Sequence, residues 1–226
     1  MTFQFLSKKQ RNEKLLLFFN GWGMNEAAIN HLVPPEGYDI LVAYDYRDFT
    51  SFPHEVKQYE SILLVAWSIG VWAVEQLRQR GLLPKVKYSL AIAGSPFIRH
   101  DRFGIPCKVF DLTLQSLNDS SREVFNRRMC GGKSNVALFK EFEKRETEEL
   151  REELNTVREI ELARQEERLL FHWNRIFIAQ KDKIIPPQNL FTLSQSYGIP
   201  QDSFPDASHF LFQDFQYWQE LLDRLS

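Results

Sequence analysis

Three polar residues occur in an order that would support acyl transfer. Ser68 lies in the sequence AWSIG, directly after the apolar run 62–66 and directly before a helix-like pattern. A serine at a sharp turn from strand to helix exposes its hydroxyl as a nucleophile, provided that the residues two before and two after it are small. Ala66 and Gly70 meet that condition. An ordinary serine that caps the N-terminus of a helix would give the same local pattern.

A serine nucleophile needs a base and an acid. Enzymes with a nucleophilic serine at such a turn have their catalytic residues in the chain order serine, acid, histidine. Of the five histidines, His209 fits this order, because it follows the last strong apolar run and lies near the C-terminus. Asp182 follows the apolar run 175–179 and is the preferred acid, which would accept the Nδ1 proton of His209. Asp206 is a rival whose spacing from His209 is too local. Asp111 is a weaker candidate that would end a strand.

A glycine-rich loop follows the first strong apolar run. Asn20-Gly21-Trp22-Gly23 comes after residues 15–19. In acyl-transfer enzymes whose nucleophilic serine lies at a turn from strand to helix, such a loop supplies one backbone N–H to the oxyanion. The residue after the nucleophile supplies the other. Those donors would be Trp22 and Ile69. A tight turn that uses glycine for its geometry alone would look similar. Together these features predict a serine-hydrolase site that requires neither a metal nor an organic cofactor.

Two tryptophans flank the serine. Trp67 adjoins Ser68, and we expect it, with Trp22, to contact the substrate. Trp72 lies about one helical turn further on, and we expect it in the core.

The elements that must position these residues alternate between strands and helices. The predicted strands are 15–19, 40–44, 62–66, 88–93 and 175–179, and the predicted helices include 25–32, 69–80 and 210–225. Continuous rather than alternating apolar strands indicate a parallel sheet that is covered on both faces. The sequence therefore predicts an α/β fold with a mostly parallel, doubly wound sheet, the α/β-hydrolase fold.

The alternation stops in the region 112–170, where residues 141–168 predict one long amphipathic helix or two. We expect a hydrolase core formed by 1–111 and 171–226, and a helical cap insertion formed by 112–170. Residues 122–145 hold seven basic and three acidic side chains, a local charge of +4. A partner-docking patch and a solvated helix surface both fit this excess. The candidate docking residues are Arg122, Arg127, Arg128, Lys133, Lys140, Lys144 and Arg145.

Composition narrows the class of protein. The 226 residues carry a net charge of −2, which argues against a nucleic-acid-binding domain. No run approaches the roughly 18 apolar residues of a membrane span, and the first residues lack the apolar segment of a signal peptide, so we expect a cytoplasmic protein with no membrane partner. Cys107 and Cys130 fit reduced thiols and have no metal-binding spacing.

The chain resembles the pimeloyl-[acyl-carrier protein] methyl ester esterases of biotin synthesis, of the BioG type. The matching stretches, spread over nearly the whole chain, are GWG (21–23), AYDY (43–46), VAWSIGVW (65–72), FGIP (103–106), KDK (181–183) and the region of His209. Asn20 departs from the histidine that is common at this position in wider α/β-hydrolases, but backbone donors carry the oxyanion role.

The resemblance implies that Ser68, Asp182 and His209 form a triad, with Trp22 and Ile69 at the oxyanion hole. It further implies hydrolysis of the methyl ester of pimeloyl-acyl-carrier protein to methanol and pimeloyl-acyl-carrier protein, with the acidic carrier protein as partner. Two other functions stay open from the residues. One is a broad-specificity short-chain carboxylesterase, and the other is a carrier-protein-binding module with little catalysis.

Overall fold

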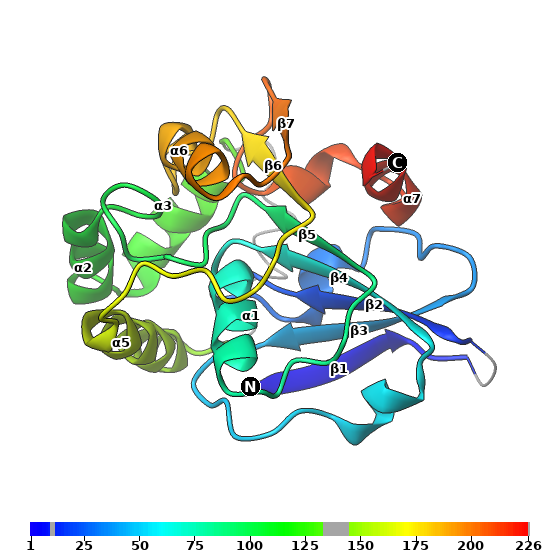
Figure 1. Ribbon diagram of the computed structural model, residues 1–226. Coiled ribbons are helices and arrows are strands. Elements are labelled where there is room, and N and C mark those ends of the chain that lie inside the picture. The colour runs from blue at the N-terminus through cyan, green and yellow to red at the C-terminus, as the bar shows by residue number, and fades with distance from the viewer. Residues whose placement is uncertain (10–11, 133–144, 226) are drawn as a thin grey trace.

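The computed structural model describes residues 1–9, 12–132 and 145–225. In this part of the chain, seven strands form one sheet in the order β1-β3-β2-β4-β5-β6-β7 (Figure 1). Neighbouring strands are parallel except for β1, which runs antiparallel to β3. The strands are β1 (Thr2–Ser7), β2 (Lys14–Phe19), β3 (Tyr38–Tyr44), β4 (Ser61–Trp67), β5 (Tyr88–Ile92), β6 (Arg175–Ala179) and β7 (Gln201–Phe204).

The five predicted strands are confirmed as β2 to β6. Their side chains are buried along nearly the whole length of each strand, as in β2, where all residues after Lys14 are inaccessible to solvent. Both faces of these strands are covered, which is why the sequence shows continuous apolar runs rather than alternation. The edge strands β1 and β7 alternate between exposed and partly buried residues, and no apolar run marks them.

Helices cover the sheet and also extend past one end of it. α1 lies against one face of the sheet, while α2, α3 and α5 lie beyond the carboxyl ends of the central strands (Figure 1). The α-helices are α1 (Ile69–Gln79), α2 (Cys107–Gln115), α3 (Asp119–Met129), α5 (Thr147–Ala163), α6 (Pro187–Tyr197) and α7 (Trp218–Leu222). The short 3₁₀ helices are η1 (Glu26–Ile29), η2 (His54–Gln58), η4 (Leu211–Asp214) and η5 (Asp223–Leu225).

Two predicted helices are wrong in extent. The segment 25–32 contains only the single 3₁₀ turn η1, and the segment 210–225 is divided among η4, α7 and η5. In the second case, tertiary hydrogen bonds take the place of helical ones. The Phe210 N–H donates to the Met129 carbonyl, and the Trp218 N–H donates to the Val33 carbonyl.

The helices α2, α3 and α5, which we call the cap helices, lie between β5 and β6 in chain order. The predicted boundary after residue 111 falls inside α2. Asp111 is therefore helical, and the expectation that it ends a strand is wrong. Residues 141–144 of the predicted long helix lie outside the described residues. The same connection thus contributes three described helices beside the carboxyl edge of the sheet.

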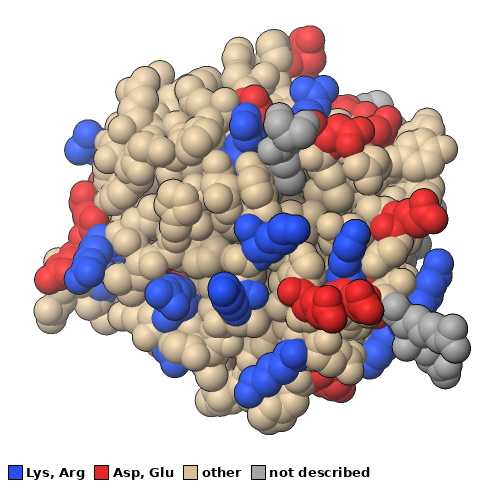
Figure 2. Space-filling view, turned by 45° about the vertical axis from the view of Figure 1, so that its right-hand side comes forward, with Lys and Arg blue, Asp and Glu red and all other residues tan. Residues whose placement is uncertain are grey.

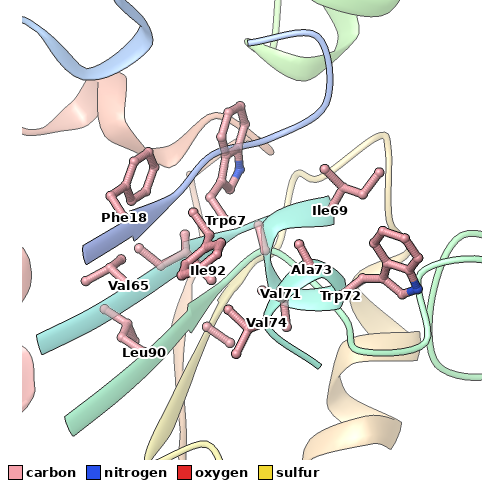
Figure 3. Close-up of a cluster of buried hydrophobic side chains, with 14 of the residues drawn as sticks. Phe18, Val65, Trp67, Ile69, Val71, Trp72, Ala73, Val74, Leu90 and Ile92 are labelled. Carbon is pink, nitrogen blue, oxygen red and sulfur yellow. The ribbon is translucent and has the colours of Figure 1, made fainter. Parts of the chain in front are cut away.

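A buried apolar cluster surrounds the junction of β4 and α1. Trp67 and Trp72 point to opposite sides of this junction, with Trp67 next to Phe18 (Figure 3). Both tryptophans are fully buried, which confirms the core position predicted for Trp72.

On the face that Figure 2 shows, several Lys and Arg side chains lie across the middle and lower part, with acidic side chains between them and toward the edges. No helix within the described ranges is long and apolar enough to cross a bilayer.

Candidate active site

Ser68 occupies the turn between β4 and α1 in a strained backbone conformation. Its φ of 56° and ψ of −122° lie in a region that L-amino acids rarely adopt. Ser68 stands at the N-cap position of α1, but its side chain makes no capping hydrogen bond. The Ser68 N–H donates to the Ile92 carbonyl of β5 (3.0 Å), which ties the turn to the neighbouring strand. The hydroxyl is thus free to point away from the helix.

The turn requires a small residue at position 70. A Cβ added to Gly70 would lie 2.3 Å from the Phe19 carbonyl oxygen and 2.8 Å from that of Asn20. Both neighbours are backbone atoms, one from the last residue of β2 and one from the residue that follows it. Ala66, on the other side of the serine, is fully buried with its methyl group accommodated.

Ser68, His209 and Asp182 form one hydrogen-bonded chain. His209 Nε2 lies 2.9 Å from Ser68 Oγ, and His209 Nδ1 lies 2.7 Å from Asp182 Oδ2. All three residues are buried, each at most 7% exposed. Because the carboxylate can only accept, Nδ1 carries the proton and Nε2 is left to accept from the serine hydroxyl. In this arrangement His209 can remove the Ser68 proton, and Asp182 can stabilise the resulting imidazolium.

Asp182 is held in place by the turn that follows β6. Its Oδ1 accepts hydrogen bonds from the N–H groups of Ile184 (2.7 Å) and Ile185 (3.0 Å), which leaves Oδ2 for His209. The rival acids lie elsewhere. The Asp206 side chain is 92% exposed and pairs with Lys181, and Asp111 pairs with Arg99 and Arg158.

The glycine-rich loop is fixed at its start by Asn20. The Asn20 N–H donates to the Ala43 carbonyl, and its side-chain oxygen accepts from the Gly21 N–H (2.9 Å). The N–H groups of Trp22 and Ile69 make no hydrogen bond to another described residue. Both residues line the same cavity as Ser68, so these two donors are available to a bound group.

The cavity at Ser68 has mostly apolar walls and a volume of about 70 Å³. The cap helices form much of the wall, and two basic side chains, Arg128 and Lys183, also line it. The lining residues are Trp22, Ser68, Ile69, Ile98, Ile105, Val109, Phe110, Thr113, Phe125, Arg128, Leu154, Lys183 and Ile184.

Trp67 does not line this cavity, and the expectation that it faces the pocket is wrong. As the last residue of β4, Trp67 points to the side of the junction where Phe18 lies (Figure 3). Its indole N–H donates to the His209 carbonyl (2.9 Å), and its ring packs against the rings of His209 and Phe210. A Cβ at Gly21 would lie 2.6 Å from the Trp67 ring. Trp67 therefore packs under the glycine-rich loop at Gly21 and against His209, on the core side of both.

The structure separates the predicted basic docking residues. Arg122 and Arg145 are buried, at 8% and 7% exposed, so their expected place on a docking surface is wrong. Arg145 forms ion pairs with Glu153 and Asp45, and Arg122 donates to the Arg145 carbonyl. A charge count cannot reveal this because it does not distinguish inward from outward side chains.

The remaining docking candidates differ in position. Arg127 is partly exposed and Arg128 is exposed. Lys133, Lys140 and Lys144 lie outside the described residues. Lys183 was not predicted, although its place directly after Asp182 was a usable signal, since a residue adjacent to the acid lies at the carboxyl edge of the sheet.

Metal-ligating side chains do not cluster in the described ranges. No group of three or more His, Cys, Asp or Glu residues there has the geometry to hold a metal ion. Cys107 and Cys130 are free thiols, and burial raises the pKa of Cys130 to about 12.

Comparisons with known proteins match the chain to a family model and to sequence relatives. The family model described as "Pimeloyl-ACP methyl esterase BioG" matches residues 1–221. An uncharacterized protein of Haemophilus influenzae is 34% identical over 214 residues, which cover 94% of this chain and 96% of that protein. A Bacteroides fragilis protein named malonyl-[acyl-carrier protein] O-methyltransferase is 41% identical over 189 residues. That match covers 82% of this chain and 37% of the relative's length.

Solved structures agree with the fold. The crystal structure of selenomethionine BioG from Haemophilus influenzae superimposes with a TM-score of 0.84 and 32% identity, over 98% of this chain and 99% of that one. An esterase from Exiguobacterium antarcticum has a TM-score of 0.72 at 14% identity, covering 99% and 94% of the two chains, and shows the likeness of fold alone. The predicted α/β-hydrolase fold is confirmed. The chain belongs to the pimeloyl-ACP methyl esterase BioG family.

Proposed function

We propose that this protein is a serine esterase that hydrolyses the methyl ester of pimeloyl-acyl-carrier protein to pimeloyl-acyl-carrier protein and methanol, in biotin synthesis. The observation that carries the proposal is the hydrogen-bonded chain Ser68–His209–Asp182 at an apolar cavity, in a chain of the BioG family.

Acylation begins at the serine hydroxyl. Ser68 Oγ attacks the methyl ester carbonyl while His209 Nε2 takes its proton, and Asp182 stabilises the imidazolium. The N–H groups of Trp22 and Ile69 donate to the developing oxyanion. The loss of one such donor typically lowers kcat by about 10²- to 10³-fold.

The tetrahedral intermediate then collapses. The bond to the methoxy oxygen breaks, and His209 returns the proton so that methanol leaves. Water next attacks the acyl-enzyme with His209 as base, and the same donors hold the second oxyanion. The second collapse releases the carboxylate and restores the Ser68 hydroxyl.

The cavity suits a substrate with an apolar chain and a charged carrier. Its walls of Ile, Val and Phe side chains match the methylene groups of a pimeloyl chain. Arg128 and Lys183 would favour the anionic phosphopantetheine arm and the acidic surface of the carrier protein. We propose that carrier docking uses Arg127, Arg128 and Lys183, together with Lys133, Lys140 and Lys144 of the cap segment.

The relatives support the same substrate class. The matched family is described by pimeloyl-ACP methyl ester cleavage. The Bacteroides fragilis relative is named for methyl transfer to a malonyl carrier protein, and part of that protein is similar to this chain. Attachment and removal of one methyl group on a carrier-bound diacid are complementary reactions.

The test is hydrolysis of a series of acyl-carrier-protein methyl esters of different chain length, followed by mass spectrometry. We expect the wild-type protein to form demethylated pimeloyl-acyl-carrier protein, and Ser68→Ala to lower the rate of this reaction by roughly 10⁴-fold or more. If the wild-type protein forms no demethylated product, the proposal is contradicted. Equal activity on short free esters would favour the broad carboxylesterase. Full biological function of Ser68→Ala would favour a binding module.

A further inference from the structure

The loop that carries the proposed oxyanion donor is in contact with a cap helix along two routes. We infer that α5 positions the Trp22 N–H, with the Trp22 indole and the Tyr46 hydroxyl as positioning groups. This inference rests on the proposed function only in that Trp22 is taken as an oxyanion donor. It assigns to the cap a role in transition-state binding in addition to covering the cavity.

The first route is direct. The Trp22 indole N–H donates to the Leu150 carbonyl of α5 at 3.1 Å. The ring of Trp22 also meets the ring of Phe125 on α3 edge to face, with centroids 4.9 Å apart and planes at 89°. Trp22 is only 7% exposed. Its side chain is therefore held by two cap helices while its backbone belongs to the loop after β2.

The second route passes through Tyr46. Glu153 of α5, which is fully buried, accepts the Tyr46 backbone N–H at 2.9 Å. The Tyr46 hydroxyl donates to the Asn20 carbonyl at 2.8 Å. Burial raises the pKa of Tyr46 well above its ordinary value, so this hydroxyl keeps the proton that it donates. The Asn20 carbonyl belongs to the peptide that leads into Gly21.

The buried Arg145 and Arg122 connect Glu153 of this second route to α3. Arg145 Nη1 lies 2.8 Å from the second oxygen of Glu153, and Arg122 of α3 donates to the Arg145 carbonyl at 2.8 Å. The Glu153 carboxylate is thereby fixed from the cap side while it holds Tyr46 on the core side.

The Trp22 N–H needs external contacts to fix its position, because the loop around it can adopt many backbone conformations. Gly21 and Gly23 flank Trp22, and Gly23 has a φ of 76°, where glycine is favoured. An oxyanion donor acts only when it lies about 2.7–3.1 Å from the oxyanion. A misplacement of about 1 Å costs on the order of 100-fold in rate. External contacts with α5 therefore supply the precision that two glycines do not.

Two substitutions each remove one hydrogen-bond donor and keep an aromatic side chain, although phenylalanine is smaller than the indole of Trp22. The Tyr46 hydroxyl lies within hydrogen-bond distance of the Ala43 carbonyl (3.1 Å) as well as that of Asn20. Trp22→Phe deletes the indole N–H, and Tyr46→Phe deletes the hydroxyl. The matched controls are Trp173→Phe and Tyr59→Phe. Trp173 is a buried tryptophan before β6 whose indole N–H has no partner among the described residues. Tyr59 is a buried tyrosine whose hydroxyl donates to Asp39, away from the cavity.

The experiment measures kcat and KM on a p-nitrophenyl ester and on the carrier-bound methyl ester. It also measures the inhibition constant of a trifluoromethyl ketone, whose adduct with Ser68 places an oxyanion in the site. We expect each test variant to lower kcat by roughly 10- to 100-fold on both esters, with KM within about threefold of wild type. Affinity for the ketone should fall in parallel with kcat/KM, and the controls should keep wild-type kinetics.

Three results would overturn the inference. They are an unchanged kcat in both test variants, a loss confined to KM, and an equal loss of kcat in the matched controls. Failure of the proposed substrate is distinguishable, because wild type would then leave the carrier ester intact while the p-nitrophenyl assay still reports on the oxyanion donor. A merely structural role of the two side chains would lower thermal stability without a selective loss of ketone affinity.

Discussion

Asp182 divides its two carboxylate oxygens between two tasks. One oxygen holds the turn after β6 through the N–H groups of Ile184 and Ile185, and the other orients His209. The acid is therefore built into the backbone of the sheet edge. This division determines what an amide at the same position would do.

Asp182→Asn should abolish most of the activity with little effect on the fold. The Asn oxygen would keep the two turn N–H groups, so that the amide NH₂ faces His209 Nδ1. Nδ1 must then accept, Nε2 carries the proton, and His209 cannot take one from Ser68. We expect kcat to fall by roughly 10⁴-fold, measured on any ester that wild type cleaves. Circular dichroism and the melting temperature serve as controls, and a kcat near that of wild type would contradict this assignment of the acid.

Gly70→Ala should affect both stability and catalysis. The added Cβ would meet two backbone carbonyl oxygens of the strand end, which cannot move aside as a flexible side chain would. The start of α1, with the Ile69 N–H, must shift. We expect a loss of about 1–3 kcal/mol in the free energy of unfolding, measured with denaturant, together with a lower kcat.

The matched control for Gly70→Ala is Gly81→Ala. Gly81 has a φ of 68° with open space around it. Alanine there should cost about 1–2 kcal/mol from backbone strain alone and leave kcat unchanged. Equal kcat values in the two variants would count against a close approach at Gly70.

At the scale of elements, α5 departs from the solvated, Glu-rich helix that its sequence resembles. Glu153 and Glu161 are buried, and burial raises the pKa of each carboxyl group, while Arg145 and Arg164 act in the opposite direction. Glu161 also accepts the indole N–H of Trp72. Two of the acidic side chains of α5 therefore attach the helix to the core rather than to water.

Arg145→Met tests this attachment. Removal of the guanidinium leaves the fully buried Glu153 carboxylate without its cation, which should cost about 3–5 kcal/mol in the free energy of unfolding at neutral pH. Without Arg145 the pKa of Glu153 rises further in the folded state than in the unfolded state. The folded variant then binds this proton more tightly, so the loss of stability should shrink as the pH falls through the raised pKa.

The measurement is denaturant unfolding of wild type and variant across a range of acidic to neutral pH. Lys181→Met, which breaks an exposed ion pair with Asp206, is the control and should change stability little. A pH-independent loss in Arg145→Met would show that Glu153 is not the group left uncompensated.

At the scale of the whole molecule, the sequence predicts best the strands that are buried along their length, because they appear in it as continuous apolar runs. The five central strands and the order of Ser68, Asp182 and His209 follow from apolar runs and from what comes after them. The edge strands β1 and β7 escape prediction because each is half exposed and offers no such run. The C-terminal segment is predicted as one helix because its local pattern is helical, whereas contacts with Met129 and Val33 interrupt it.

The direction in which a side chain points is the second property that the sequence does not predict. Adjacency to Ser68 places Trp67 near the site in sequence, but the alternation of strand side chains turns it into the core. The charge excess of the cap region combines Arg128, which lines the cavity, with Arg122 and Arg145, which are buried. Only tertiary structure separates these cases, because each depends on which neighbours a helix face meets.

The hydrogen bond from the Trp67 indole to the His209 carbonyl joins residues 142 positions apart. Contacts of such long range form late, since a long stretch of chain must be ordered before they close. Ser68 and Trp67 leave the ribosome well before His209, so a growing chain holds the serine before its proposed base has been made. The proposed catalytic chain of Ser68, His209 and Asp182 therefore assembles only after residue 209 has been synthesised, and we expect a chain truncated before that residue to lack esterase activity.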